Sequence, residues 1–356
     1  MNPWRLLAKH AGWLILGLAL LAPLVLSTYD LSILGRFLAL SILGIGISLI
    51  WGHAGILSLG QGVFFGLGGY ALAMHLKMVA DQGMPDFMLW NGVESLPWWW
   101  QPFQSGAFAL VMVLVVPALM SALLGWLVFR RRITGVYIAL ITQALTLAFS
   151  TLLVSQQGLT GGFNGLTNFR SLFGYRLADP DVRIILYYVS LIVLAGVYRG
   201  AAWVTRTHLG KILLAIRDGE NRVRFSGYNT ASYKTFAFAL SGMLAGIAGA
   251  LYTLHVGVIS PAMVGVVPSI EMVVWVALGG RDSLAGAVLG TLLGNLAKDQ
   301  ISSAFPEMWL YVIGALFVLV VTALPKGLIG IAQQSRKVAG QWGKPALKLR
   351  DERPGA

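Results

Sequence analysis

The chain has 356 residues, of which 57% are hydrophobic and 11% are charged, and it contains 43 glycines and no cysteine. Soluble domains carry about 25% charged residues, so this chain cannot cover a globular core with polar surface and is predicted to lie in a membrane. The lack of cysteine excludes disulfide bonds, a thiol nucleophile and cysteine-bound metal. The formal net charge of +12 can be interpreted only after the basic residues have been placed relative to the membrane.

Apolar stretches long enough to cross a bilayer recur along the whole chain. The first follows Arg5 and Lys9, as in a signal peptide, but no A-x-A cleavage site comes after it, so it is expected to be retained. The predicted fold class is therefore an all-α polytopic membrane protein with about ten transmembrane segments, some of them short or broken. The predicted crossings are 12–28, 31–51, 54–76, 107–129, 133–154, 184–204, 231–254, a short one at 268–280, 284–300 and 307–325.

The basic residues predict the orientation of these crossings. With a cytoplasmic N-terminus, 19 of the 26 lysines and arginines fall in inner loops and five, including Lys298, in outer loops. The positive-inside rule then predicts that both the N-terminus and the C-terminus are cytoplasmic. The charge of +12 is accounted for by this topology; membrane lipid is the expected neighbour of the inner loops, and no nucleic acid is needed to explain it.

Two predicted crossings are interrupted by polar or glycine residues. Residues 51–62 place Ser58 and Gln61 among glycines, and the short crossing 268–280 carries Glu271. Irregular polar backbone is tolerated at membrane depth where it is buried in protein or lines a water-filled cavity. Paired interrupted segments in the two halves of a transporter point to the transport site. Either segment could also be an ordinary helix end.

Four polar residues are the predicted transport-pathway candidates: Ser58, Gln61, Asn164 and Glu271. Glu271 is ionisable within a predicted crossing, which marks a functional candidate, although a carboxylate at the interface would give the same pattern. Asn164 belongs to a glycine-rich turn that could equally be a plain loop. Arg36 and Arg199 lie near the ends of crossings, where they are expected to snorkel to the interface without a transport role.

Signatures of enzymes are missing from the sequence. The chain contains no phosphate-binding G-x-x-x-x-G-K-[ST] loop, no H-E-x-x-H and no G-x-S-x-G, and its five histidines include no i, i+4 pair. The chain is therefore not expected to be an enzyme, to bind a metal or to hold a cofactor of its own. Glycines at four-residue spacing, as in Gly286-x-x-x-Gly290-x-x-x-Gly294, instead predict closely packed helices.

The inner loop between the crossings 184–204 and 231–254 contains an amphipathic segment. Gly210 and Gly219 bracket residues 211–218, which include several apolar positions. We predict a short helix outside the membrane whose apolar face is covered either by the membrane surface or by a groove of another protein. The mixed charges of Arg217, Asp218 and Glu220 favour the protein partner.

This segment resembles the cytoplasmic coupling segment of permeases in the branched-chain amino acid (LivM-type) ABC importer family. The matching residues are Gly210-Lys211-x-Leu213-x-Ala215-Ile216-Arg217-Asp218-x-Glu220 and Gly227-Tyr228-Asn229. Further similar stretches lie at 57–70, 160–165, 245–252 and 279–286, and residues 85–91 and 96–103 resemble the urea-transporter permease subunit, UrtC. Asp282 and Gly219 depart from the family pattern, which usually has a small residue such as Gly and an Asn there.

The resemblance implies a permease subunit, over residues 1–330, of an ABC importer in the bacterial inner membrane, followed by a basic cytoplasmic tail at 331–356. Its cytoplasmic coupling segment would span 207–229. The implied solute is urea, or otherwise a short-chain amide or a branched-chain amino acid. The implied partners are a homologous second permease, two cytoplasmic ATPase subunits that use ATP, and a periplasmic or extracellular solute-binding protein. The residues implied in ATPase coupling are Gly210, Ala215, Ile216, Arg217, Asp218, Glu220 and Gly227.

Two alternatives stay open on the sequence. A passive channel for a small polar solute would use the inner loop only to bind lipid. A secondary transporter would use Glu271 as its proton or sodium site.

Overall fold

The structure is a computed structural model that describes residues 19–81, 83–323 and 327–330. Most of the predicted crossing 12–28 and the whole predicted tail 331–356 lie outside these residues. The described part is mainly helical, as predicted, with four strands of two residues each in its loops: β1 (Leu166–Thr167), β2 (Ser171–Leu172), β3 (Tyr175–Arg176) and β4 (Val258–Ile259). β1 pairs with β4, and β2 pairs with β3, both antiparallel.

Six helical segments in the described residues are long and apolar enough to cross a membrane. They are α2 (Thr28–Ile47) with its π-helical continuation η1 (Ser48–His53), α3 (Gln61–Ala80), α5 (Gly106–Arg130), α6 (Val136–Ser155), α8 (Pro180–Arg206) and α10 (Thr230–Val256). The remaining helices are α4 (Asp86–Trp90), η2 (Gln101–Gln104), α7 (Gln157–Thr160), η3 (Gly162–Asn164), α9 (His208–Phe225), α11 (Pro261–Val264), α12 (Val266–Gly279), α13 (Leu284–Ala304), η4 (Pro306–Met308) and α14 (Trp309–Ala323). Ten crossings thus remain a prediction.

The boundaries of two predicted elements are corrected. The predicted crossing 54–76 is helical only from Gln61, because residues 54–60 form an irregular segment that contains Gly55 at φ 70°. The predicted short helix 211–218 is part of the longer α9, which runs from His208 to Phe225 and has non-helical backbone at Gly219. The predicted break at Gly219 is therefore present, and a second helical piece follows it.

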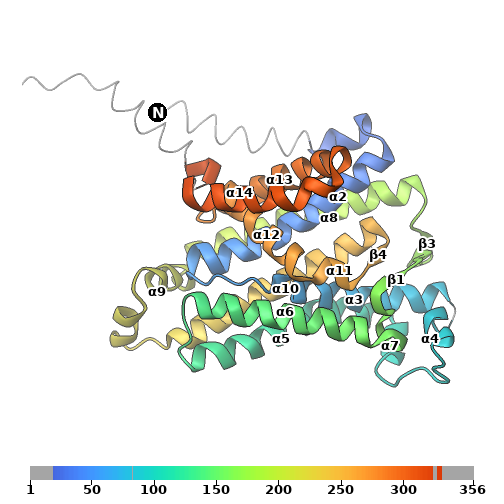
Figure 1. Cartoon of the computed structure of the whole chain (residues 1–356), viewed down its shortest axis with the longest axis horizontal. Helices are drawn as coiled ribbons and strands as arrows, with labels where there is room; N and C mark the ends of the chain where they lie inside the picture. Colours follow the sequence, from blue (N-terminus) through green and yellow to red (C-terminus); the bar gives the residue numbers. More distant parts are fainter. Residues whose placement is uncertain (1–18, 82, 324–326, 331–356) are drawn as a thin grey trace, which may run out of the picture.

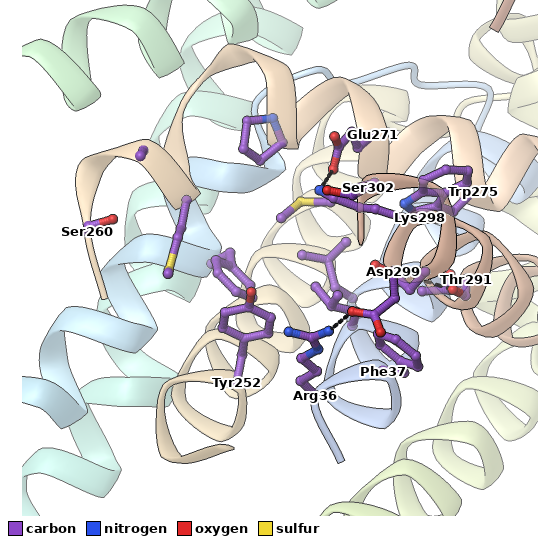
Figure 2. A pocket seen from close by; sticks show the side chains of 18 of the residues that line it. Arg36, Phe37, Tyr252, Ser260, Glu271, Trp275, Thr291, Lys298, Asp299 and Ser302 are labelled. Atoms are coloured by element: carbon purple, nitrogen blue, oxygen red, sulfur yellow. Dashed lines mark hydrogen bonds and ion pairs between the residues drawn. The ribbon is translucent and has the colours of Figure 1, made fainter. Parts of the chain in front are cut away.

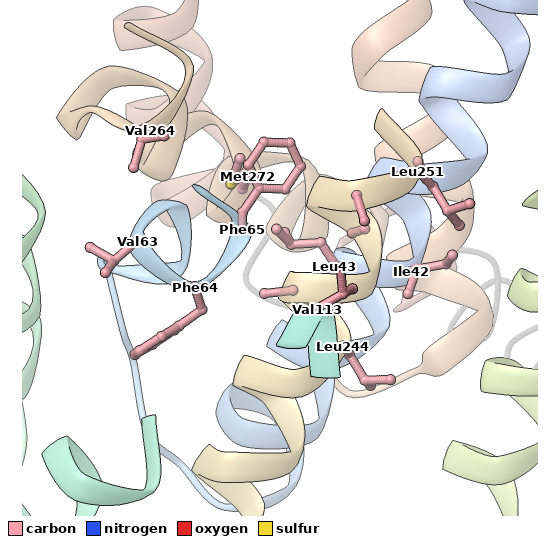
Figure 3. Packing of buried hydrophobic residues seen from close by; sticks show 14 of the residues in the cluster. Ile42, Leu43, Val63, Phe64, Phe65, Val113, Leu244, Leu251, Val264 and Met272 are labelled. Atoms are coloured by element: carbon pink, nitrogen blue, oxygen red, sulfur yellow. The ribbon is translucent and has the colours of Figure 1, made fainter. Parts of the chain in front are cut away.

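Glycines bring α3 and α10 together in the centre of the bundle. α10 packs against α2, α3 and α5. A Cβ added at Gly249 would overlap the carbonyl of Phe65, and one added at Gly68 would overlap the backbone of Gly246, so these helices touch backbone to backbone. Aliphatic and aromatic side chains fill the remaining space, as Figure 3 shows for Ile42 and its neighbours. The glycine spacing thus serves packing within this chain, as predicted.

The two ends of the bundle differ in composition. One end, here the basic end, holds the turn 130–132, helix α9 and the turn 281–282; Figure 1 shows α9 at the left. The opposite end, here the loop end, holds α4, α7 and the strands, at the right of Figure 1. The loops predicted to lie inside therefore gather at one end, and the long loops predicted to lie outside gather at the other.

The helices also differ in how far they are covered by the rest of the chain. The apolar windows of α2 with η1 and of α3 are 78% and 89% buried, whereas that of α5 is only 22% buried. Exposed leucines such as Leu119 and Leu123 cover the surface of α5. Such an apolar surface needs lipid or a partner helix against it.

Candidate functional site

A cavity of about 540 Å³ opens between α2, α10, α12 and α13. We call it the charged pocket, because two basic and two acidic side chains line it: Arg36, Lys298, Glu271 and Asp299 (Figure 2). Hydroxyl groups of Tyr252, Ser260, Ser302 and Ser303 line it as well. Charged residues within membrane-spanning structure are costly unless they are paired or face a water-filled cavity, and here the four charged residues form two ion pairs.

Glu271 is held by partners from two other helices. Its carboxylate forms an ion pair with Lys298 of α13 and accepts a hydrogen bond of 2.9 Å from the indole Nε1 of Trp309, the first residue of α14. Only 8% of the Glu271 side chain is exposed, against 36% for Lys298. A buried carboxylate requires such donors, so α12, α13 and α14 are tied together at the pocket.

Arg36 and Asp299 form the second ion pair, between α2 and α13. Their side chains remain 29% and 34% exposed. Arg36 lies eight residues after the start of α2 at Thr28, or about 12 Å along the helix. The expectation that Arg36 snorkels to the interface stays a prediction, and the structure adds that its guanidinium lines the pocket and pairs with Asp299. Lys298, expected in an outer loop, lies in α13.

Gln61 begins α3 inside the bundle, next to the charged pocket. It is fully buried, and within the described residues neither its amide nitrogen nor its amide oxygen has a hydrogen-bond partner. Phe65, one helical turn further along the same face, lines the pocket together with Met272; Figure 3 shows these two side chains near each other. The polar amide thus lies one helical turn before a residue of the pocket's apolar wall. An unpaired buried amide costs about 1–3 kcal/mol.

The start of α3 meets α11 and the first turn of α12. The neighbouring Gly62 leaves no room for a Cβ beside the hydroxyl of Ser269 and the carbonyl of Val264. The two interrupted segments singled out in the sequence therefore come together in space, with Gln61 beside their contact. This is the arrangement in which discontinuous helices form transport sites near the middle of a membrane.

The remaining pathway candidates are placed differently. Ser58 is 2% exposed, and its hydroxyl accepts a hydrogen bond of 3.3 Å from the backbone N–H of Gly60. Asn164 is exposed in η3 at the loop end and lies outside the charged pocket. Of the four sequence candidates, Glu271 lines the pocket, Gln61 is the first residue of α3, and Ser58 belongs to the irregular segment that precedes it. Within the described ranges, no group of three or more acidic or histidine side chains could hold a metal ion.

Sequence analysis missed Arg36, Lys298 and Asp299. Lys298 and Asp299 follow the apolar first part of α13 and lie among its polar last turns, so their charges are visible in the sequence. Their partners, however, lie 27 and 263 residues away in the chain. Pairing at such separations follows from the packing of α13 against α2 and α12, and no local pattern encodes it.

Helix α9 lies at the basic end with one face turned toward the bundle. Gly210, Ile212, Leu213 and Ile216 are buried, and Gly210 lies so close to the backbone of Thr205 that no side chain fits there. Ala215 is exposed on the opposite side. Gly227 ends the segment in a left-handed turn at φ 88° with open space around it. The apolar face of α9 is therefore largely covered by this chain, and the face around Ala215 is exposed in the part of the chain that the structure describes.

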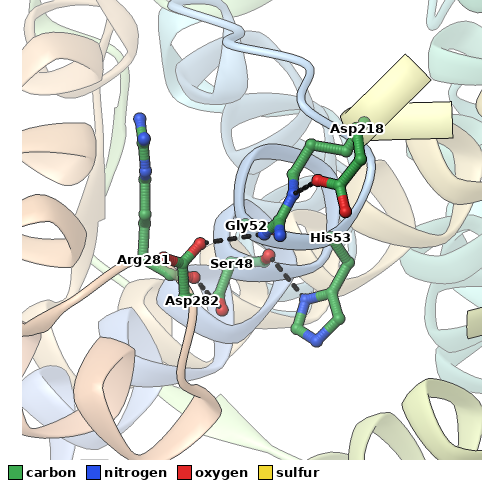
Figure 4. Close-up of polar contacts among 7 residues, drawn as sticks. Ser48, Gly52, His53, Asp218, Arg281 and Asp282 are labelled. Carbon is green, nitrogen blue, oxygen red and sulfur yellow. Dashed lines mark hydrogen bonds and ion pairs between the residues drawn. The ribbon is translucent and has the colours of Figure 1, made fainter. Parts of the chain in front are cut away.

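Arg217 connects α9 to the basic ends of two membrane segments. Its guanidinium donates hydrogen bonds to the carbonyl of Gly52 in η1 and, at 3.1 Å, to the carboxylate of Asp282, between α12 and α13. Ser48 donates to the carbonyl of Arg281 at 2.8 Å, which joins η1 to the same turn (Figure 4). Asp282, where the family pattern has a small residue, thus supplies a carboxylate that reaches α9.

Glu220 attaches the second piece of α9 to the start of α10. Its carboxylate accepts hydrogen bonds from Lys234 and Thr230, each at 3.0 Å, and from Arg224 at 3.2 Å. Burial by itself would raise the pKa of Glu220, but the hydrogen bonds and the charges of Lys234 and Arg224 outweigh it and hold this pKa below its usual value. The carboxylate is therefore ionised and fixed at neutral pH.

A charged pocket among apolar spans, together with an amphipathic helix bound to the ends of those spans, defines a membrane permease rather than an enzyme. The sequence profile of the family described as "Branched-chain amino acid transport system / permease component" matches residues 30–321. The chain belongs to this family of transporter permease components, and it is a multi-pass protein of the inner membrane.

Relatives are found among permeases for different solutes. The chain is 26% identical over 346 residues to the high-affinity branched-chain amino acid permease LivM of Salmonella typhimurium, covering 91% of this chain and 75% of that protein, and the values for LivM of Escherichia coli are the same. The ribose import permease RbsC of Haemophilus influenzae is 26% identical over 198 residues, which cover 54% of this chain and 58% of RbsC. No solved structure matches the chain significantly.

Proposed function

We propose that the chain is the permease subunit of an ATP-driven importer that moves a small polar solute into the cytoplasm through the charged pocket. The observation that carries this proposal is the convergence of Glu271, Lys298, Arg36 and Asp299 on one cavity within an apolar bundle. The two basic and two acidic side chains of the charged pocket balance each other, so the pocket suits a solute without net charge. The basic end is proposed to face the cytoplasm, because cationic loops remain on that side.

The proposed solute is urea or a short-chain amide. Residues 85–91 and 96–103 resemble the urea permease subunit, and urea presents a carbonyl acceptor and N–H donors without charge. The pocket offers matching partners, with carboxylates that accept from N–H groups and a guanidinium that donates to a carbonyl. Ser58 and Gln61 would receive the solute deeper in the bundle, and Asn164 would contact it, if at all, at the loop end.

A branched-chain amino acid is the second candidate, favoured by the LivM relatives and by the paired charges. A zwitterion carries one ammonium and one carboxylate group. Its ammonium group could bind Glu271 or Asp299 in place of the native basic partner. Its carboxylate could bind Arg36 or Lys298 in place of the native acidic partner.

ATP would be hydrolysed on two separate cytoplasmic subunits, with a homologous second permease and an external solute-binding protein completing the importer. The exposed face of α9 around Ala215 and Asp218 is the proposed ATPase contact. Gly210, Ile216 and Glu220 would hold α9 in place, Gly227 would let the chain turn into α10, and Arg217 would pass the movement of α9 to η1 and to the turn at Asp282.

Uptake into proteoliposomes tests this function. The chain is reconstituted alone and with its partner subunits, and entry of labelled urea, acetamide and leucine is measured with and without ATP. We expect ATP-dependent uptake of urea by the complete complex and no flux through the chain alone. Flux through the chain alone would show a passive channel, and uptake driven by a proton or sodium gradient without ATP would show a secondary transporter. Preferential uptake of leucine would identify the amino acid as the solute.

A further inference from the structure

A second cavity, of about 670 Å³, lies at the basic end between the last turns of α5 and the first turns of α10. We call it the arginine pocket, because Arg130, Arg132 and Arg224 line it. None of its lining residues is acidic, and the hydroxyl groups of Ser232 and Thr235 add polar partners. The cavity is therefore strongly cationic and well supplied with hydrogen-bond donors.

The three arginines differ in how far their charge is neutralised. Arg224 shares the carboxylate of Glu220 with Lys234 and Thr230. Arg130 stacks on the ring of Trp126 at 5.1 Å from its centre, and neither Arg130 nor Arg132 has an acidic partner within the described part of the chain. Their charges are therefore available to an anion from outside the chain.

The other wall of the arginine pocket is apolar and continues into the membrane. Trp126 and Phe236 line the cavity and are 48% and 52% exposed. Leu123 and Leu119 lie three and seven residues before Trp126, on the same face of α5, and are 52% and 63% exposed. Cationic groups at the end of a span therefore lead directly into an apolar strip along the least covered helix of the bundle.

We propose that the arginine pocket binds the phosphate headgroup of an anionic phospholipid, whose acyl chains lie along α5 beside Leu119 and Leu123. Guanidinium groups bind phosphate oxygens through paired N–H donors, and basic pockets between transmembrane helices bind anionic headgroups. The apolar strip favours a lipid over a free phosphate, because a free phosphate has no apolar part that could pack against it. It also favours a lipid over an acidic segment of a partner protein, which would approach from the aqueous side. The site requires no particular solute and no ATP-driven transport.

Native mass spectrometry of the purified chain tests the site. Phosphatidylglycerol and phosphatidylcholine are titrated separately, and the bound lipid is counted for the wild type and for Arg130→Gln, Arg132→Gln and the double variant. We expect preferential retention of phosphatidylglycerol that falls about fivefold for each arginine removed. The matched control is Arg170→Gln with Arg176→Gln at the loop end, which should change nothing. Arg130→Lys with Arg132→Lys should restore most of the binding and shows that the fold is intact.

Tryptophan fluorescence locates the lipid. Phosphatidylglycerol with brominated acyl chains should quench more emission than the equivalent phosphatidylcholine, and the difference should disappear in Trp126→Phe. Equal binding of both lipids, or unchanged binding in the double Gln variant, overturns the proposal. Displacement of the lipid by inorganic phosphate at equal concentration would assign the site to a free anion. Loss of ATPase co-purification in the double Gln variant without loss of lipid would assign it to a partner protein.

Discussion

Ion pairs occur in two regions of this permease in different surroundings. In the charged pocket, Glu271 and Lys298 form an ion pair in the wall of a cavity between helices. At the basic end, Arg217 and Asp282 join a surface helix to a turn between two membrane segments, with side chains 32% and 56% exposed. The same chemistry thus lines a cavity in one place and attaches a surface helix in the other. Burial makes the first ion pair costly to break, whereas exposure makes the second contribute little to stability.

The largest effect is expected from Glu271→Ala in the charged pocket. Removing the carboxylate leaves Lys298 and Trp309 without their partner. We expect loss of uptake and a decrease in the free energy of unfolding of about 2–3 kcal/mol, below the range for fully buried pairs because Lys298 keeps 36% of its side chain exposed. Uptake assays and thermal unfolding in detergent measure both. The control is Glu307→Ala, at an exposed position in η4. A similar loss of uptake and stability in this control would contradict a role of the charged pocket in transport.

Ala215→Trp should abolish uptake by a different route. The indole would occupy the exposed face of α9 where we place the ATPase, so recruitment of the ATPase should fall by at least about tenfold while the bundle stays folded. Co-purification and uptake are measured together, with Ala178→Trp at an exposed site of the loop end as the matched control. Full ATPase binding and full uptake by Ala215→Trp would refute the coupling role.

Gln61→Leu separates transport from stability. Replacing an unpaired buried amide by an apolar side chain should leave the free energy of unfolding unchanged or raise it by about 1–3 kcal/mol, while loss of a hydrogen bond to the solute should reduce uptake about tenfold. Gln101→Leu, exposed in η2, serves as the control. Unchanged uptake with altered stability would make Gln61 a packing residue.

Arg217→Gln and Asp282→Asn should weaken the connection between α9 and the spans. We expect a decrease in uptake of up to about fivefold, since a partly exposed ion pair contributes about 0.2–1 kcal/mol, with ATPase activity retained. The double variant should behave like Arg217→Gln alone, because that substitution already removes the contact with Asp282 together with the hydrogen bond to Gly52. Arg206→Gln, which is also basic and exposed near α9, is the control. Additive losses would show that the two residues act separately.

The smallest effect concerns pH. Because the pKa of Glu220 is held below its usual value, its pairing contributes fully above the usual glutamate pKa of about 4.3 and is lost as the pH falls through the lowered value. Wild-type stability should therefore decrease more than that of Glu220→Gln between pH 7 and pH 3, by less than about 1 kcal/mol. Equal decreases in the free energy of unfolding of the two proteins across this pH range would contradict the assignment of a lowered pKa to Glu220.

The sequence determined the membrane class and most of the long helices. It also determined the glycine-mediated packing, the break at Gly219 and the gathering of basic loops at one end. These features follow from hydropathy, glycine spacing and charge, which are local properties of the chain. It also singled out Glu271 and Gln61, since a polar residue in an apolar span is visible without a structure. Only the tertiary structure placed Arg36 against Asp299 and Arg217 against Asp282, across 263 and 65 residues of chain. Ion pairs of that separation depend on how whole helices pack, and many packings are compatible with the same local pattern.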